Sequence, residues 1–318
     1  MKIAVLEYEN VIKSSVAGPY DMFSQLNGLA KMLLPDSEIE EISVEILSSS
    51  RLKNDDKYDL VIVPAMEFST IFQVLEREQN MINWIKLQYE KGAEIASICL
   101  GAFLLAATGL LAKKRATTHW MGAEIFKKMY PETRLVDDKI ITDYDRIYTS
   151  GGAYSFTTLI IYLIEKYFGH EVAIIVSKVF LIHIHDSVQT PFNILNLQKS
   201  HNNDTIESVQ RYIESNFSKG IRIEELAKMA NMTDRTFMRN FKKATGNSPY
   251  EYIQKVKIEK AKKLLELKDI GIEQVSFEVG YNDFAAFRKT FKKYAGLTPS
   301  KYKKTYGKMF RPDFVYAK

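Results

Sequence analysis

Two short segments of the chain carry paired phenylalanines on one side and basic residues on the other. They are residues 233–245, TDRTFMRNFKKAT, and residues 283–295, DFAAFRKTFKKYA. In each segment the phenylalanines are four residues apart, so a helix would place them on one face and most basic side chains on the opposite face. The opposite faces consist of Arg235, Met238, Arg239 and Lys242 in the first segment and of Ala285, Arg288, Lys289 and Lys292 in the second. Two such helices predict a negatively charged partner that repeats in space, and double-stranded DNA is the leading candidate.

The chain's single cysteine, Cys99, is the other residue that could do chemistry. It follows an apolar run and is followed by Leu100 and Gly101, as on a sharp turn from a strand into a helix. Such a turn exposes the side chain at the carboxyl end of a sheet, and the N-terminus of the next helix can lower the pKa of a thiol. A lone cysteine is usually a small buried hydrophobe. Here the strand-to-helix context favours a pocket.

The composition, 46% hydrophobic and 26% charged, is that of a soluble globular protein. No apolar run approaches the roughly 20 residues that a membrane span needs. Glu7 and Glu9 come too early for the apolar region of a signal peptide. One cysteine excludes an internal disulfide and fits a reducing compartment. We therefore expect a cytoplasmic protein with no membrane partner.

The net charge of +5 conceals a difference between the two parts of the chain. Residues 1–200 hold 20 Lys and Arg against 25 Asp and Glu, whereas residues 201–318 hold 24 against 14. A basic half of this kind indicates binding to nucleic acid or to another anionic surface. Solvated lysine faces that bind no partner are the alternative explanation.

The elements that would position Cys99 alternate between strands and helices. Apolar runs predict strands at 2–8, 43–48, 58–64 and 93–99, and helical spacing predicts helices at 20–33, introduced by Gly18-Pro19, and at 68–91, 102–111, 155–168 and 171–185. Residues 134–150 resemble two strands joined at Asp137-Asp138. This alternation predicts a doubly wound parallel sheet.

A change of composition separates this half from the basic half. Residues 189–204 lose helical periodicity and gather proline and asparagine, so we expect a domain at 1–188, a linker at 189–204 and a second domain at 205–304 with a tail at 305–318. The second domain is predicted to be helical at 205–217, 223–230, 233–245 and 250–267, with Thr233 capping the third helix. The helix–turn–helix pattern then repeats at an offset of 49 to 50 residues, with one residue inserted in the second turn.

Residues 1–185 resemble the PfpI/ThiJ (class-I glutamine-amidotransferase-like) superfamily. The resemblance rests on SICLGAFLLAATGLL at 97–111, RATTHW at 115–120 and IYTSGG at 147–152. It implies a flavodoxin-like domain with a pocket at Cys99, Leu100, His119, Met66 and Gly152. The chain departs from the enzymes of that superfamily at three places: Leu100 follows the cysteine, Ser15 replaces an acid, and Ala65-Met66 replaces a glycine pair that supplies oxyanion donors. Asp21 and Glu67 are the nearest acidic candidates for a general base.

Residues 205–304 resemble the AraC/XylS family of transcription regulators. FMRNFKKATGNSPYEY at 237–252 and GYNDFAAFRKTFKKYAGLTPSKY at 280–302 carry the resemblance, and the order of the two domains is that of GlxA-like regulators. It implies that Arg235, Met238 and Arg239 face bases in one major groove and that Ala285, Arg288 and Lys289 do so in the next. Lys242 and Lys292 would touch phosphates. The expected protein is a homodimeric, non-enzymatic DNA-binding regulator, controlled through the linker by an unidentified metabolite, with no metal or cofactor.

Two alternatives remain open at this point. One is a PfpI/isocyanide-hydratase-like cysteine enzyme with an appended DNA-binding domain, which requires an activated Cys99 thiol. The other is a first domain that only dimerises and binds no ligand.

Overall fold

The computed structural model describes residues 1–33, 41–182, 201, 203–268 and 270–307. The chain divides into two compact units, Met1–Gln189 and Thr190–Lys318, and each is described by itself. Of the predicted linker, residues 189–200 and 202 lie outside the described residues, as do residues 308–318 of the predicted tail. None of the described helices combines the length and the apolar character that crossing a membrane requires.

The first unit is built on a largely parallel sheet. Within the described residues, six strands lie in the order β2-β1-β3-β4-β8-β7, and only the edge strand β7 runs antiparallel to its neighbour. They are β1 (Lys2–Glu7), β2 (Ser43–Ser48), β3 (Leu60–Val63), β4 (Glu94–Ile98), β7 (Ile141–Tyr144) and β8 (Ile147–Ser150); β5 (Arg115–Ala116) and β6 (Arg134–Leu135) form a separate parallel pair. Residues of β3 and most of β1 and β4 are buried, as expected of central strands covered on both faces.

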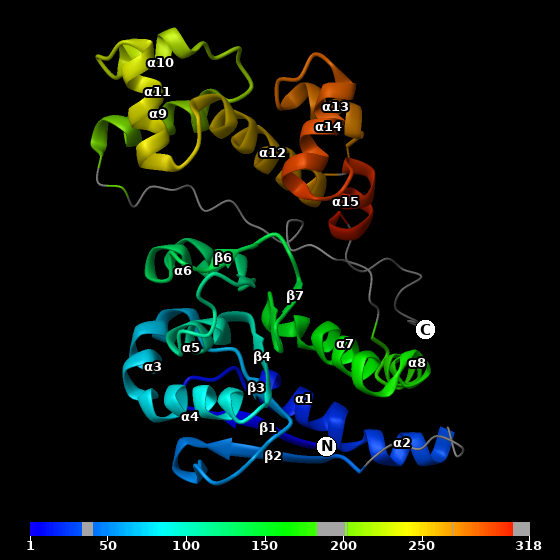
Figure 1. Ribbon diagram of the computed structural model, residues 1–318. Helices are drawn as coiled ribbons and strands as arrows, with labels where there is room; N and C mark the ends of the chain where they lie inside the picture. Colours follow the sequence, from blue (N-terminus) through cyan, green and yellow to red (C-terminus); the bar gives the residue numbers. More distant parts are fainter. Residues whose placement is uncertain (34–40, 183–200, 202, 269, 308–318) are drawn as a thin grey trace. The chain divides into compact units, whose positions relative to one another are not determined.

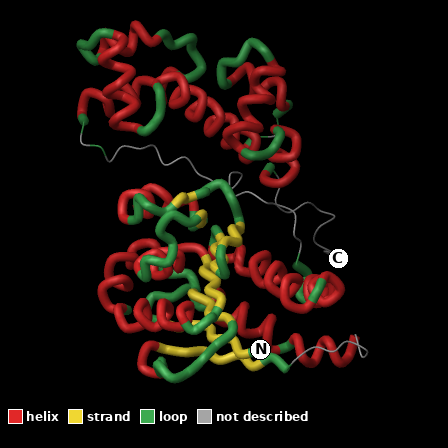
Figure 2. Tube along the Cα trace, in the orientation of Figure 1, coloured by secondary structure: helices red, strands yellow, loops and turns green. Residues whose placement is uncertain are grey.

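Helices cover both faces of this sheet (Figures 1 and 2). One group of mutually contacting helices consists of α1 (Ser14–Ser24), α2 (Leu26–Leu33), α7 (Phe156–Phe168) and α8 (His170–Val179), and the other of α3 (Ile71–Arg77), α4 (Gln79–Glu90) and α5 (Ala102–Ala107). Helix α6 (Ala123–Met129) follows β5. Single 3₁₀ turns lie at Ser49–Arg51, Phe68–Thr70, Cys99–Gly101, Trp120–Gly122 and Ala153–Ser155. The predicted doubly wound α/β fold is confirmed.

Several predicted helix boundaries are wrong. Helix α1 begins at Ser14, so Pro19 lies inside it rather than before it, because the first turn buries Ser15 and Val16 in the core. The helix predicted at 68–91 is broken at Glu78, whose buried carboxylate accepts a hydrogen bond from the Ser49 hydroxyl. The helix predicted from 171 is α8, which ends at Val179, and residues 183–185 of that prediction lie outside the described residues.

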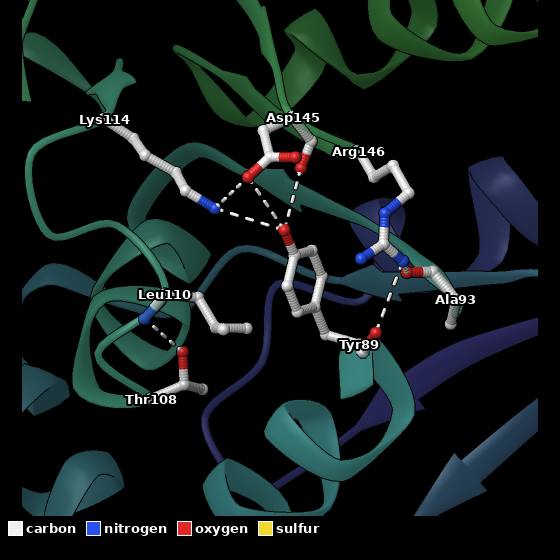
Figure 3. A network of polar contacts seen from close by, with 7 residues as sticks. All are labelled: Tyr89, Ala93, Thr108, Leu110, Lys114, Asp145 and Arg146. Atoms are coloured by element: carbon white, nitrogen blue, oxygen red, sulfur yellow. Dashed lines mark hydrogen bonds and ion pairs between the residues drawn. The ribbon is translucent and has the colours of Figure 1, made fainter. Parts of the chain in front are cut away.

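The strand pair predicted to turn at Asp137-Asp138 turns instead at Asp145-Arg146. Both residues have positive φ, 52° and 59°, as in the two-residue turns that suit the twist of a hairpin. Figure 3 shows the contacts that hold this turn: the Asp145 carboxylate accepts a hydrogen bond from the Tyr89 hydroxyl at 3.0 Å and pairs with Lys114 at 2.6 Å. Arg146 donates to the backbone oxygens of Tyr89 and Ala93. Tertiary contacts therefore place the turn.

The second unit is helical throughout its described elements (Figure 2). Its helices are α9 (Asp204–Asn216), α10 (Ile223–Met229), α11 (Asp234–Thr245), α12 (Pro249–Leu267), α13 (Ile272–Glu278), α14 (Phe284–Ala295) and α15 (Pro299–Tyr306). They form two small cores, the first around Phe237 and Phe241 and the second around Phe287 and Phe291. Helix α12 contributes buried residues to both, so it connects two helix–turn–helix units, as predicted.

Candidate nucleic-acid interface and the Cys99 turn

Helix α11 presents one buried and one exposed face. It begins where Thr233 accepts a hydrogen bond from the Thr236 backbone N–H, and it ends at Gly246, whose φ of 72° stops the helix. Phe237 and Phe241 are fully buried, with ring centroids 5.5 Å apart. The structure places four predicted contact residues on the exposed face: Arg235, Met238, Arg239 and Lys242.

Helix α14 repeats this arrangement in the second helix–turn–helix unit. The Asp283 carboxylate accepts hydrogen bonds from the backbone N–H groups of Ala285 and Ala286, and Gly296 ends the helix with a φ of 72°. Phe287 and Phe291 are fully buried. The four residues predicted here are also exposed: Ala285, Arg288, Lys289 and Lys292. The guanidinium of Arg288 lies 6.0 Å from the ring centre of Phe284, which gives this long side chain an aromatic support.

Each exposed helix is held by a shorter helix before it. Helix α10 packs on α11 through buried Leu226 and Ala227, and the Met232 N–H closes the turn by donating to the Ala227 carbonyl at 3.0 Å. In the second helix–turn–helix unit, α13 buries Val275 and packs on α14. A short helix, a tight turn and an exposed second helix are the parts of a helix–turn–helix motif, whose second helix enters a major groove.

Cys99 lies on the sharp strand-to-helix turn that the sequence predicts, but the expectation that this turn exposes its side chain is wrong. Cys99 follows β4 with a φ of 56°, and it is only 3% exposed. Gly101 permits the turn, because a Cβ there would lie 2.3 Å from the Pro64 carbonyl oxygen. Burial raises the pKa of the Cys99 thiol to about 12, so at neutral pH the sulfur is protonated.

The backbone next to Cys99 is already engaged in hydrogen bonds. The Ser15 hydroxyl accepts the Ala65 backbone N–H at 2.9 Å and donates to the Ile12 carbonyl at 2.6 Å. Met66, which is fully buried, forms a bridge with Val11. The Ala65 amide, in the place where a glycine pair would supply an oxyanion donor, therefore serves the fold.

Two of the remaining predicted pocket residues, His119 and Gly152, lie next to one another. A Cβ added to Gly122 would lie 2.6 Å from Leu100, and one added to Gly152 would lie 3.7 Å from the His119 ring. His119 Nδ1 accepts the Met121 N–H at 3.1 Å, so the neutral ring carries its proton on Nε2. Burial lowers the pKa of His119, which favours this neutral form.

Sequence reasoning missed two residues of this site. Thr118 donates to the Cys99 carbonyl at 3.0 Å and thereby fixes the loop that carries His119 to the cysteine turn. The Tyr8 hydroxyl donates to the Pro64 carbonyl at 2.5 Å, and burial raises its pKa. Thr118 stood next to His119 in the motif already singled out, whereas nothing in the spacing of Tyr8 points to the site.

The acidic candidates for a general base do not lie in a buried site. Asp21 and Glu67 are both exposed. Among the described residues, no group of three or more histidine, cysteine or acidic side chains could hold a metal ion.

Comparison with known proteins decides the family. Residues 1–166 match the DJ-1/PfpI family, and residues 226–305 match a helix-turn-helix domain. The chain belongs to the DJ-1/PfpI family. It joins a DJ-1/PfpI domain to an AraC-type helix-turn-helix domain, which is the domain composition of GlxA-like transcriptional regulators.

Relatives of this DJ-1/PfpI chain include named regulators. The HTH-type transcriptional regulator CdhR of Pseudomonas aeruginosa is 25% identical over 228 residues, which are 69% of this chain and 66% of that protein. The HTH-type transcriptional regulator GlxA of Rhizobium meliloti is 24% identical over 220 residues, 68% of this chain and 67% of that protein. The chain thus spans about two thirds of the length of these relatives. Among solved structures, Drosophila melanogaster DJ-1beta covers 57% of this chain and 98% of its own, at 17% identity and a TM-score of 0.44.

Proposed function

We propose that the protein is a DNA-binding transcription regulator that inserts α11 and α14 into successive major grooves. The observation that carries the proposal is the repeated arrangement of these helices: each has a buried phenylalanine pair and an exposed face with basic side chains. Successive major grooves on one face of DNA are about 34 Å apart. The excess of positive charge in residues 201–318 supports the same partner.

The exposed residues divide into two roles. Arg235, Arg239 and Arg288 can make paired hydrogen bonds to guanine, while Met238 and Ala285 offer apolar contact and Lys289 a single, less directional donor. Lys242 and Lys292 lie nearer the helix ends and bind phosphates, which positions the protein without reading sequence.

The DJ-1/PfpI domain acts as a sensing and dimerising domain in this proposal. A small metabolite would bind among Cys99, Leu100, His119, Met66 and Gly152, and two copies of the chain would pair through this unit. The support is the constrained turn together with the neutral histidine beside it. Binding would change, through residues 189–204, how the pair of helix–turn–helix units as a whole is presented to DNA, so that effector and DNA affinity are coupled.

The alternative is a cysteine enzyme with a DNA-binding appendage, and one observation favours it: the positive φ of Cys99 is the geometry of a nucleophile on a sharp turn. The raised thiol pKa and the engaged Ala65 amide weigh against it. A thiol assay separates the two. The regulator predicts that native Cys99 reacts with a soft electrophile at pH 8 far more slowly than the unfolded chain does, and the enzyme predicts a faster native reaction.

The first experiment is selection of DNA from a random or genomic library by the purified protein, with and without a metabolite extract. We expect enrichment of two half-sites about one helical turn apart. The double variant Arg239→Ala/Arg288→Ala should lose the enrichment, whereas Lys178→Ala, which removes an exposed charge from the first unit, should keep it. Failure of the wild-type protein to enrich any sequence would refute the proposal.

A further inference from the structure

The two helix–turn–helix units touch one another at a place other than the connecting helix. Phe217 directly follows α9 of the first helix–turn–helix unit, and its ring packs against the cores of both helix–turn–helix units. The ammonium of Lys260 on α12 lies 5.5 Å from the centre of the same ring. A side chain that belongs to both cores resists a rotation of one unit against the other, because the rotation would expose apolar surface.

Ser218, the residue after Phe217, brings the backbones of the two helix–turn–helix units close together. Gly280, in the turn between α13 and α14, has a φ of 80°, and a Cβ there would lie 2.3 Å from the Ser218 carbonyl oxygen. Glycine therefore meets two requirements at this position: a left-handed conformation and a close approach to the first unit. The turn of the second unit rests directly on the loop that follows α9.

Lys257 fastens this turn from α12. Its side chain is buried, its ammonium donates to the Gly280 carbonyl at 2.7 Å, and it lies 5.1 Å from the Tyr281 ring centre. The Tyr281 hydroxyl also bonds to Gln254 on the same helix. Burial lowers the pKa of Lys257, so keeping a charged group here costs free energy that the hydrogen bond and the ring offset. A lysine placed only for solubility would not be buried.

We propose that Phe217, Ser218, Lys257 and Gly280, the inter-unit seam, fix the distance between α11 and α14, and that Lys257 is the positioning residue that makes the pair accept one half-site spacing. This role rests on the function proposed above, and it explains how the regulator would select DNA by the spacing of its half-sites. One inserted base pair moves a half-site by about 3.4 Å and rotates it by about a tenth of a turn. Two units held by both α12 and the seam cannot follow that displacement, whereas units joined by α12 alone could bend toward it.

The first test measures the seam without DNA. Spin labels at Met238→Cys and Lys289→Cys report the distance between the exposed helices of the free protein, and the only native cysteine, Cys99, is buried and stays unlabelled. We expect a narrow distance distribution that broadens in Lys257→Met and Gly280→Ala and is restored in Lys257→Arg. The matched controls should stay narrow: Lys228→Met removes an exposed charge from α10, and Gly271→Ala adds a methyl group to open space in the second helix–turn–helix unit. Narrow distributions in both seam variants would overturn the proposal.

The second test uses the unlabelled protein and DNA selected by the wild type, with zero, one or two base pairs inserted between the half-sites. Wild-type affinity should fall about tenfold with one inserted pair, and both seam variants should discriminate by about threefold or less, mainly through weaker binding at the selected spacing. Lys257→Met with wild-type discrimination would refute the role of Lys257 in spacing. If the wild type selects no DNA, the proposed function fails, and the distance distributions still decide whether the seam holds the units together.

Discussion

The cores of the two helix–turn–helix units are nearly superimposable in their ring geometry. The phenylalanine pair of α11 has its centroids 5.5 Å apart and that of α14 5.6 Å apart, each at an interplanar angle of 58°. The second ring of each pair meets a tyrosine edge-on at 5.4 Å, Tyr252 in one unit and Tyr302 in the other. Each tyrosine hydroxyl then donates to a glutamate, Glu214 of α9 or Glu266 of α12. The end of α12 thus supports the second unit as α9 supports the first.

The turns of the two units differ where the cores agree. Asn231 takes the left-handed conformation of the first turn with a φ of 52°, a conformation that asparagine tolerates. The second turn uses Gly280, because the Ser218 carbonyl leaves no room for a side chain. The second turn also carries the contact with Lys257. The repeat therefore preserves the residues that bury apolar surface and changes those at which the two helix–turn–helix units meet.

Removing the second phenylalanine ring of either core should destabilise the protein most. Phe241→Ala and Phe291→Ala should each lower the free energy of unfolding by about 3–5 kcal/mol, because each leaves a cavity in a small core. Hydrogen exchange followed by mass spectrometry should show α10 and α11 losing protection in Phe241→Ala, and α13 and α14 in Phe291→Ala. Equal loss across both units in either variant would show that they unfold as one.

The exposed faces of α11 and α14 should differ in how strongly their basic side chains read bases. Arg239→Ala should weaken binding to the selected DNA by about 1–3 kcal/mol and relax the preference at one base pair of the first half-site. Lys289→Ala, one position after Arg288 on α14, should cost less, because an ammonium lacks the two-pronged geometry of guanidinium. Binding isotherms on all single-base variants of the site would measure both. An unchanged base preference in Arg239→Ala would contradict its assignment as a base-contacting residue.

Helix α11 shows how much of the fold could be predicted from the sequence alone. The spacing of Phe237 and Phe241, the cap at Thr233 and the stop at Gly246 are local signals, and each predicts a boundary or a face of α11 that the structure contains. Continuous apolar runs likewise located the central strands. These features follow from contacts between residues close in the chain.

What the sequence did not reveal depends on residues far apart in the chain. The hairpin turn at Asp145 is held by Tyr89 and Lys114, neither of which is its neighbour in sequence. Ser15 could be recognised as a missing acid, but not as the partner of the Ala65 amide 50 residues away. Lys257 carries no local signal in the sequence, because its burial against Gly280 arises only when the second helix–turn–helix unit folds back on α12.

The helix caps should differ in strength between the units. The Asp283 carboxylate accepts two backbone N–H groups, at 2.8 and 3.3 Å, whereas the Thr233 hydroxyl accepts one at 3.4 Å. Asp283 also places a negative charge at the positive end of the α14 dipole. Within the usual range of about 0.5–2 kcal/mol for loss of a cap, Asp283→Ala should therefore destabilise more than Thr233→Ala. Urea denaturation compares them, and the opposite order would show that the distances do not govern cap strength here.

The smallest effect concerns the lysines at the ends of the exposed faces. Lys242→Ala and Lys292→Ala should each reduce the slope of log affinity against log salt by about 1, because one phosphate contact and its released counterion are lost. Affinity should fall uniformly for matched and mismatched sites, since a phosphate contact carries no base information. Anisotropy titrations at several salt concentrations measure the slope, with Arg239→Ala as the comparison that should alter base preference. If Lys242→Ala instead changed the preferred base while Lys292→Ala did not, the first unit would extend base contacts one helical turn further than the second, and the two exposed faces would no longer be equivalent.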